Sequence, residues 1–219
     1  MICLNLINES NQQFVNDFLN RFKHTYVDER HYEMVRLNDQ LYFFHQLSRL
    51  NEEDDQVVFD AVVHMQISLQ IHDLVEFRFT PEYLPTETEE SNQMNALLGD
   101  YHSAWFYKLL AGHGKLDALH HFVQPVKRIN QLKMELLHNQ ALSDEEKMDA
   151  IETIYMGLFD AYADYYSIEQ YPTERKRIAY HFIFREQPFW MNRMQSERKI
   201  GEVWKERKVQ LEAELINCQ

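Results

Sequence analysis

The chain has 219 residues, enough for one sizeable domain or at most two small ones. Because 45% of its residues are hydrophobic it can bury a core, and its net charge of −13 disfavours a nucleic-acid role, which needs a basic face. Only five glycines and five prolines occur, so tight turns are few and the composition favours long helices over a β-sandwich or an α/β fold.

Cysteine usage and hydropathy bear on the compartment. The two cysteines, Cys3 and Cys218, lie near opposite termini and suggest neither a disulfide framework nor a cysteine-based zinc site, which fits a reducing cytoplasm. We find no signal-peptide pattern and no stretch of the length that a membrane span requires. The sequence therefore predicts a soluble cytoplasmic protein.

The first half of the chain predicts three helical segments in succession. Residues 10–25 carry a phenylalanine at every fourth position, and residues 28–50 continue a helical pattern. Residues 52–78 form the most apolar segment, which opens with acidic side chains suited to the positive end of a helix dipole. This segment is apolar on nearly all sides, so we expect a central, buried helix.

The middle of the chain is punctuated by proline and glycine. An acidic stretch over 82–91 is the best loop candidate, and a helix over 92–111 follows, ended by Gly112. A further helix over 115–140 contains Pro125, where we expect a bend or a break because proline cannot donate its backbone hydrogen bond.

The last third of the chain predicts three more helices. Ser143 and Glu146 form a capping box for a helix over 144–167, and Pro172-Thr173 opens the next helix. A long charged helix over about 189–216 ends the chain. Since no repeat, low-complexity segment or linker is apparent, we predict a single all-α helical bundle domain over 1–219.

Several side-chain pairs could in principle hold a metal ion. Asp160 and Asp164 lie four residues apart on one helix face, although exposed acids on an amphipathic helix share this spacing by chance. Glu135 and His138 match the Glu-x-x-His spacing of di-iron bundles, but those bundles need the motif twice. Asp54-Asp55 is better interpreted as a solvated first turn of a helix.

The histidines of the central helix have two interpretations. His64 and His72 lie two turns apart and could share a ligand. A buried neutral histidine that donates to a carbonyl or carboxylate is the commoner arrangement. No phosphate-binding loop, nucleophile elbow or zinc-protease motif accompanies them, so these motifs do not make a complete catalytic site.

Two stretches resemble a known superfamily. "SLQIHDLVEF" (68–77) resembles the first aspartate-rich helix of trans-isoprenyl diphosphate synthases, Ser-Leu-x-His-Asp-Asp-x-x-Asp, and "NALLGDYHSAWFYKLLA" (95–111) resembles the Gly-Asp helix that follows it. The longer string from Gly99 to Lys133 is similar to one branch, the small subunit (component I) of the heterodimeric heptaprenyl or hexaprenyl diphosphate synthases of Gram-positive bacteria. The resemblance covers roughly 55–165 and implies the isoprenoid synthase type of helical bundle.

The departures from the superfamily pattern bear on catalysis. Asp73 matches the first aspartate, but Leu74 replaces the second and Phe77 the last, and only Arg78 remains of the basic pair that follows. Mg²⁺ prefers several oxygen ligands in near-octahedral geometry, which this stretch does not supply. Residues 170–219, where the second aspartate-rich motif should lie, contain no aspartate. We therefore interpret His72, Asp73 and Glu76 as a vestigial motif that holds no metal.

The resemblance implies a non-catalytic subunit of a heterodimeric prenyltransferase. A catalytic partner would supply Mg²⁺ and the diphosphate sites, and the complex would condense isopentenyl diphosphate onto farnesyl diphosphate for the menaquinone side chain. The chain alone would be inactive, would use no cofactor and would help to set product length. Two alternatives remain: a divergent Mg²⁺-dependent terpenoid synthase that uses Asp73, Glu76 and the Asp160/Asp164 pair, and an unrelated helical adaptor.

The resemblance also implies positions for the interface and the product tunnel. The superfamily's dimers form through the equivalent helices, so we expect the Gly99-Asp100 helix to expose an apolar face to the partner. The residues that match the tunnel positions of catalytic relatives precede Asp73 by one and two turns. The predicted interface or tunnel residues are Trp105, Phe106, Tyr107, Leu109, Leu110, Met65, Ser68 and Leu69.

Overall fold

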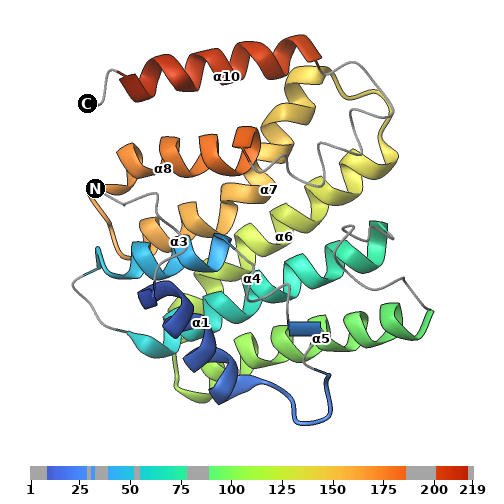
Figure 1. The fold of residues 1–219 in the computed structure, drawn as a ribbon, viewed down its shortest axis with the longest axis vertical. Coiled ribbons are helices and arrows are strands. Elements are labelled where there is room, and N and C mark those ends of the chain that lie inside the picture. Colours follow the sequence, from blue (N-terminus) through green and yellow to red (C-terminus); the bar gives the residue numbers. More distant parts are fainter. Residues whose placement is uncertain are drawn as a thin grey trace. The chain divides into compact units, whose positions relative to one another are not determined.

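The computed structural model describes residues 9–28, 31–32, 39–51, 55–77, 89–185 and 201–216. Every regular element in these ranges is helical (Figure 1), which confirms the prediction of an all-α protein. None of the described helices is both long and apolar enough to cross a lipid bilayer. The chain divides into two compact units, residues 2–119 and residues 120–219, which are described separately. The prediction of a single domain stays a prediction.

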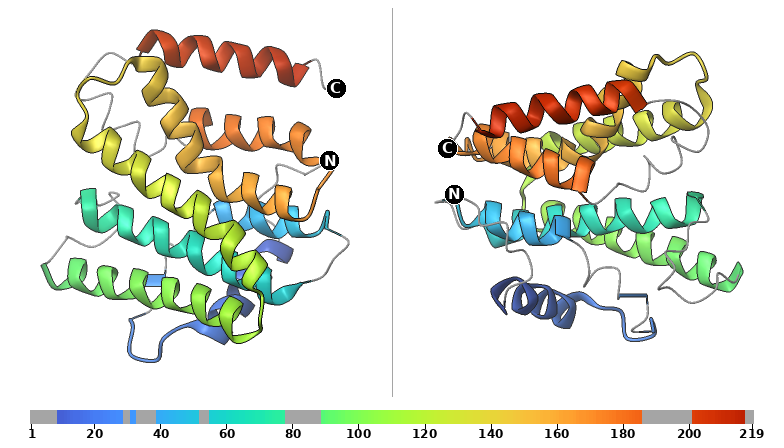
Figure 2. Two further views of the ribbon diagram at one scale, coloured as in Figure 1. Left: turned by 180° about the vertical axis from the view of Figure 1, so that it is seen from behind. Right: turned by 45° about the horizontal axis from the view of Figure 1, so that its top comes forward.

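The first unit is built around one buried helix. Its elements are α1 (Glu9–Phe22), α3 (Asp39–Ser48), α4 (Gln56–Phe77) and α5 (Glu89–Gly112), and α6 (Leu116–His138) begins at its end. Every residue from Val58 to Leu69 of α4 is buried, which confirms the prediction of a central helix. Helices α4 and α5 lie side by side along most of their length in Figures 1 and 2.

Parts of the predicted boundaries differ from the structure. The first helix ends at Phe22 rather than at residue 25, and a turn follows over 25–26. Within the predicted 28–50 segment, residues 39–48 form α3, whereas 29–30 and 33–38 lie outside the described residues. The turn places the Tyr32 hydroxyl where it accepts a hydrogen bond from the backbone N–H of His24, at 2.7 Å.

An ion pair fastens α1 to α4. The Arg21 guanidinium donates two hydrogen bonds to the carboxylate of Asp60, at 2.7 and 2.9 Å. Gln56 donates a third hydrogen bond to the same carboxylate, at 2.8 Å. Asp60 is buried in the apolar part of α4, where an unpaired carboxylate would be costly. Arg21 therefore contributes to stability chiefly by keeping a buried charge paired.

The second unit contains the remainder of α6, α7 (Asp144–Tyr165), α8 (Tyr171–Tyr180), a π-helical turn η1 (His181–Arg185) and α10 (Gly201–Ile216). The capping box is confirmed: Ser143 accepts from the Glu146 N–H, and Glu146 accepts from the Ser143 N–H. Pro172 lies in the first turn of α8, as predicted. The predicted C-terminal helix is confirmed over 201–216, and residues 186–200 lie outside the described residues.

Of the bend or break expected at Pro125, the break is wrong, because α6 is continuous through that residue. A bend there stays a prediction. Proline removes one backbone hydrogen bond and disfavours a helix interior by roughly 3 kcal/mol. The two buried side chains that flank it, Phe122 and Ile129, show that packing on both sides of the proline holds the helix together. Tertiary burial here outweighs a local preference that the sequence pattern alone could not weigh.

We expect Arg21→Met to destabilise the protein by about 2 kcal/mol, less than for a fully buried pair because Arg21 is partly exposed. Methionine keeps the apolar stem but leaves Asp60 without its cation. The matched control is Arg128→Met, which removes an exposed pair with Glu135 and should cost less than about 0.5 kcal/mol. Chemical denaturation measures both, and equal losses would contradict a structural role for the Arg21–Asp60 pair.

Candidate functional site

A stripe of polar side chains runs along one face of the apolar helix α4. Asp60, His64, Ser68 and His72 follow one another at intervals of four residues, so they share a face. The first three are buried, and His72 is about one-third exposed. Two of the four contact α5, and we call this contact region, with Gly99, Asp100 and His102 of α5, the α4–α5 seam.

At one end of the seam, the ring of His72 lies directly against the backbone of Gly99. A Cβ atom at residue 99 would approach Nε2 of His72 to 2.7 Å and Cε1 to 2.8 Å, closer than real Cβ atoms come to a neighbour. The same Nε2 lies 3.4 Å from a carboxylate oxygen of Asp100. Glycine at this position therefore lets the His72 ring lie against the backbone of α5.

At the other end of the seam, His64 and His102 form a buried pair. Their Nδ1 atoms lie 2.8 Å apart, which is a hydrogen-bond distance. A neutral imidazole carries one N–H, so one ring donates through Nδ1 and the other accepts through Nδ1. Within the described structure neither Nε2 atom has a hydrogen-bond partner, and both side chains are fully buried.

Aromatic rings surround this pair. Trp105 stacks on His64, with ring centroids 5.8 Å apart, and Phe18 and Phe22 of α1 contact the same ring. Burial in this apolar setting lowers the pKa of His64 to about 2, helped by His102 and Arg21, and burial lowers the pKa of His102 to about 3. The pair is therefore neutral and acts as a structural link between α4 and α5.

The stretch around His72 and Asp73, which we interpret from its sequence as a vestigial motif, is described only in part. Between residues 72 and 75, the described side chains include one carboxylate, that of Asp73. The next residue in the sequence is Leu74. His72 offers an imidazole nitrogen, whereas Mg²⁺ takes oxygen ligands. The side chains of Leu74, Glu76 and Phe77 lie outside the described residues. Among the described residues, no group of three or more histidines, cysteines, aspartates and glutamates could hold a metal ion.

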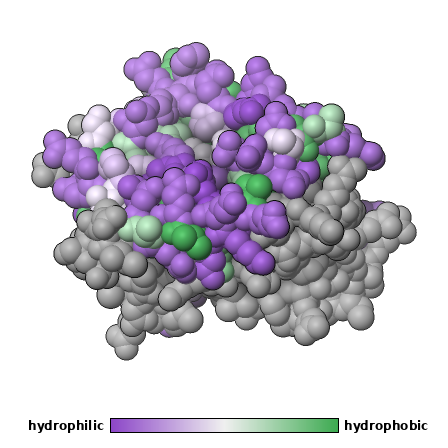
Figure 3. Space-filling model, turned by 90° about the horizontal axis from the view of Figure 1, so that it is seen from above, coloured by the Kyte–Doolittle hydropathy of each residue, from purple (hydrophilic) through white to green (hydrophobic). Residues whose placement is uncertain are grey.

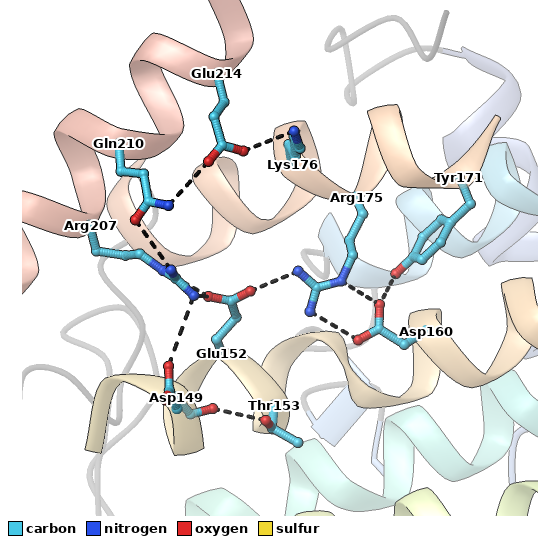
Figure 4. A network of polar contacts seen from close by, with 10 residues as sticks. All are labelled: Asp149, Glu152, Thr153, Asp160, Tyr171, Arg175, Lys176, Arg207, Gln210 and Glu214. Atoms are coloured by element: carbon cyan, nitrogen blue, oxygen red, sulfur yellow. Dashed lines mark hydrogen bonds and ion pairs between the residues drawn. The ribbon is translucent and has the colours of Figure 1, made fainter. Parts of the chain in front are cut away.

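The other predicted metal pairs have structural partners. Both carboxylate oxygens of Asp160 accept from Arg175, at 2.7 and 3.0 Å, and the Tyr171 hydroxyl donates to one of them at 2.6 Å (Figure 4). Asp164 is exposed, with His121 at 3.9 Å. Asp160 is thus neutralised by a guanidinium of the same unit.

Two further candidates have equally ordinary roles. The Asp55 carboxylate accepts from the Val58 N–H at the start of α4 and pairs with Lys115 at 2.6 Å. Burial alone would raise the pKa of Asp55, but the hydrogen bonds from Lys115 and the Val58 N–H, together with the charge of Lys115, outweigh burial and lower that pKa. Glu135 pairs with Arg128 along α6, at 3.5 Å, and His138 is exposed at the end of that helix.

Sequence reasoning missed the polar network of the second unit (Figure 4). Arg175 bridges Asp160 and Glu152, and Arg207 of α10 donates to the second oxygen of Glu152 at 2.7 Å. Burial alone would raise the pKa of Glu152, but the hydrogen bonds from both arginines lower it. The sequence around Glu152 gives no sign of these partners, which come from helices distant in sequence.

The expected interface residues on α5 divide into buried and accessible side chains. Phe106 and Leu110 are 0% exposed, so the expectation that they lie on an exposed apolar face is wrong. Trp105 and Leu109 are half-buried, and Trp105 has the Lys108 ammonium 4.1 Å from its ring centre. Tyr107 is 47% exposed. The helical period explains the error: 106 and 110 share the face that packs inward.

The expected tunnel residues are all in the core. Met65, Ser68 and Leu69 of α4 are each less than a tenth exposed. Ser68 belongs to the polar stripe, between His64 and His72. Whether any of these residues meets a prenyl chain is not tested by their burial, and that role stays a prediction.

A family model described as heptaprenyl diphosphate synthase (HEPPP synthase) subunit 1 matches residues 20–213, which is most of the chain. A search of curated proteins and a search of solved structures each gave no significant match.

We expect Gly99→Ala to destabilise the protein by about 1–3 kcal/mol, because the new methyl group overpacks the seam against His72. In a His72→Ala background the sign should reverse, since alanine is the better helix former by up to about 1 kcal/mol. A double-mutant cycle measured by chemical denaturation gives the coupling. Additive effects of the two substitutions would contradict a contact between the His72 ring and residue 99.

We expect the His64–His102 pair to make stability fall as the solution is acidified. In the unfolded chain both rings titrate near pH 6.5, whereas in the folded chain their pKa values lie at about 2 and about 3. Below pH 6.5 the unfolded state therefore binds more protons, and lowering the pH from 7.5 to 5.5 should cost about 2–3 kcal/mol through this pair.

The measurement compares urea unfolding at the two pH values for the natural chain and for the double variant His64→Leu/His102→Leu. The double variant should lose about 2–3 kcal/mol less stability on acidification. Substituting the exposed His120 and His138 by leucine is the matched control and should leave the pH dependence nearly unchanged. An equal pH dependence of the natural chain and the buried-pair variant would contradict a neutral buried pair.

Proposed function

We infer the function of this chain from one premise: it belongs to the family of heptaprenyl diphosphate synthase subunit 1. The chain is therefore a subunit of a prenyl diphosphate synthase, and it acts with a partner subunit. We propose that it is the non-catalytic member of a cytoplasmic heterodimer. The complex condenses isopentenyl diphosphate onto farnesyl diphosphate and makes the prenyl chain of menaquinone.

The observation that carries the non-catalytic role is the donor set at the aspartate-rich position. Asp73 is followed by Leu74, and the neighbouring His72 ring packs on Gly99. A cluster that binds Mg²⁺ and draws diphosphate from an allylic substrate needs several carboxylate oxygens on one face. We therefore assign the aspartate-rich motifs, Mg²⁺ and the diphosphate sites to the catalytic partner.

The alternative of an independent terpenoid synthase has less support. It requires Asp160 and Asp164 as metal ligands, but Arg175 and Tyr171 occupy the carboxylate of Asp160. A cation would have to displace a guanidinium that is already bidentate, which is an unfavourable exchange. The alternative therefore needs a rearrangement that the non-catalytic role does not.

We propose the outward face of α5 as the surface that meets a helix of the catalytic partner. Its exposed residues alternate at spacings of four and three, the pattern by which two helices pack at a shallow angle. Leu97 and Tyr107 are large exposed apolar side chains, and alanines between and beyond them allow close approach. The residues of this α5 outer face are Gln93, Leu97, Asp100, Ala104, Tyr107 and Ala111.

The same arrangement suggests how this chain influences product length. Its own expected tunnel positions, Met65, Ser68 and Leu69, are core residues. We therefore propose that the prenyl tail begins in the partner and meets this chain only where the two subunits pack together. In this account the side chains of the α5 outer face, Tyr107 foremost, limit the space into which the tail grows.

The proposal is tested by reconstitution with a prenyl diphosphate synthase chain that carries two intact aspartate-rich motifs, from the same source. The chain alone should make no prenyl diphosphate from farnesyl and isopentenyl diphosphates with Mg²⁺, and the mixture should make a long-chain product. Turnover by the isolated chain would favour the synthase alternative. Unchanged activity on mixing would favour the adaptor alternative, and either result contradicts the proposal.

The docking surface is tested in the same system with Leu97→Asp and Tyr107→Glu. Each should weaken association by about 2 kcal/mol or more, because each places a charge on an apolar contact. The matched control is Met134→Asp, an equally exposed apolar residue on α6, which should associate normally. Analytical ultracentrifugation of each variant with the catalytic chain distinguishes these results, and normal association of both α5 variants would place the interface elsewhere.

A further inference from the structure

Helix α10 is attached to the second unit mainly through charged and polar contacts (Figure 4). Arg207 donates to Glu152 of α7 at 2.7 and 3.2 Å, and the Glu214 carboxylate pairs with Lys176 of α8 at 2.9 Å. The Tyr180 hydroxyl donates to Glu212 at 2.6 Å. These contacts lie in the second half of α10, between residues 207 and 214.

The apolar side chains of α10 are mostly half-buried rather than buried, among them Val203, Trp204 and Leu215. Leu211 is the one buried side chain among residues 202–215 of α10. Trp204 is half-buried and meets the ring of Phe184 edge-on, with centroids 4.8 Å apart. The exposed side chains of α10 are hydrophilic apart from Val209 and Ala213. Hydrophilic residues, in purple, predominate among the coloured residues of the face shown in Figure 3.

The buried carboxylates of the second unit keep a cationic partner without α10. Glu152 bonds through one carboxylate oxygen to Arg175 of α8 and through the other to Arg207. If α10 leaves, Arg175 still pairs with Glu152 and with Asp160, so no buried ion is stranded. The Phe159–Phe182 stack, with centroids 6.0 Å apart, also joins α7 to η1 without α10.

We propose that α10 is a detachable helix, held on α7 and α8 by a salt-sensitive latch of Arg207, Glu212 and Glu214. The latch opens locally while α7 and α8 remain folded, and it uncovers the edge of Glu152 and the ring of Phe184. The inference does not depend on the proposed function, because it concerns one unit of this chain alone.

The physical basis is the difference in screening between the two kinds of contact. The latch pairs are about one-third exposed at one or both partners, so added salt weakens them. The screening length falls from about 10 Å at 0.1 M salt to about 3 Å at 1 M salt. Hydrophobic packing of α7 with α8 is not weakened by salt in this way.

Hydrogen exchange of the full chain, read by mass spectrometry, tests the latch. Between 0.05 M and 1 M potassium chloride, the amides of 203–215 should exchange several-fold faster, while those of 148–160 should keep their protection. Arg207→Leu should accelerate exchange of α10 at low salt by about tenfold or more, because it removes a charge-assisted pair to a largely buried carboxylate.

Two controls make the test specific. Lys205→Leu removes the same charge from the outward face of α10 and should leave its exchange unchanged. Reversing one latch pair with Lys176→Glu should accelerate exchange, and adding Glu214→Lys should restore protection. Exchange of α10 in step with α7 at every salt concentration, or an equal effect of Arg207→Leu and Lys205→Leu, would overturn the proposal.

Discussion

The close approach of α4 and α5 is the constraint on which the account of this protein depends. Gly99 admits the ring of His72 at a distance that no other residue allows without displacement. Two turns before His72 on α4, the His64 ring is hydrogen-bonded to the His102 ring across the same seam. In the trans-isoprenyl diphosphate synthases that the sequence resembles, the equivalent helix presents carboxylates to a metal cluster. Here the stretch presents an imidazole to its neighbouring helix. We propose that this contact takes the place of metal chemistry.

The helices within each unit are joined by a different kind of polar contact. In the first unit the seam relies on a buried, neutral imidazole pair, whose pKa values are lowered by burial. In the second unit α7, α8 and α10 share a charged network, in which hydrogen bonds lower the pKa of Glu152 and raise that of Arg175 against the effect of burial. Acid therefore weakens the first unit through its histidines, whereas salt acts on the outer contact of the second.

The helical fold was predictable from local pattern, but its long-range contacts were not. The central helix, the Ser143–Glu146 capping box and the proline at the start of α8 follow from composition and spacing, and the structure confirms them. The expected break at Pro125 failed because packing on both sides of it outweighs one lost hydrogen bond. The partners of His64 and Glu152 come from other helices, so spacing alone gave no sign of them.

On α5, the helix was likewise predictable from the sequence, whereas the contacts of its side chains were not. The helix that carries Trp105 and Tyr107 was predictable, but the side on which each residue lies was not. Phe106 and Leu110 point inward and Tyr107 outward, which depends on where the other helices of the unit pack. The polar side chains at every fourth residue of the apolar helix α4, from Asp60 to His72, were a signal that could have revealed the seam, because a buried polar stripe needs partners.

The central claim is that the vestigial motif takes no part in the chemistry, and Asp73→Asn in the reconstituted complex tests it most directly. Asparagine keeps the size of the side chain and removes its charge. The account predicts a steady-state rate within a few-fold of the natural complex, with normal assembly, whereas loss of a working metal ligand costs orders of magnitude. A fall in rate of about a hundredfold or more, with assembly intact, would contradict the account by showing that this carboxylate reaches the reaction.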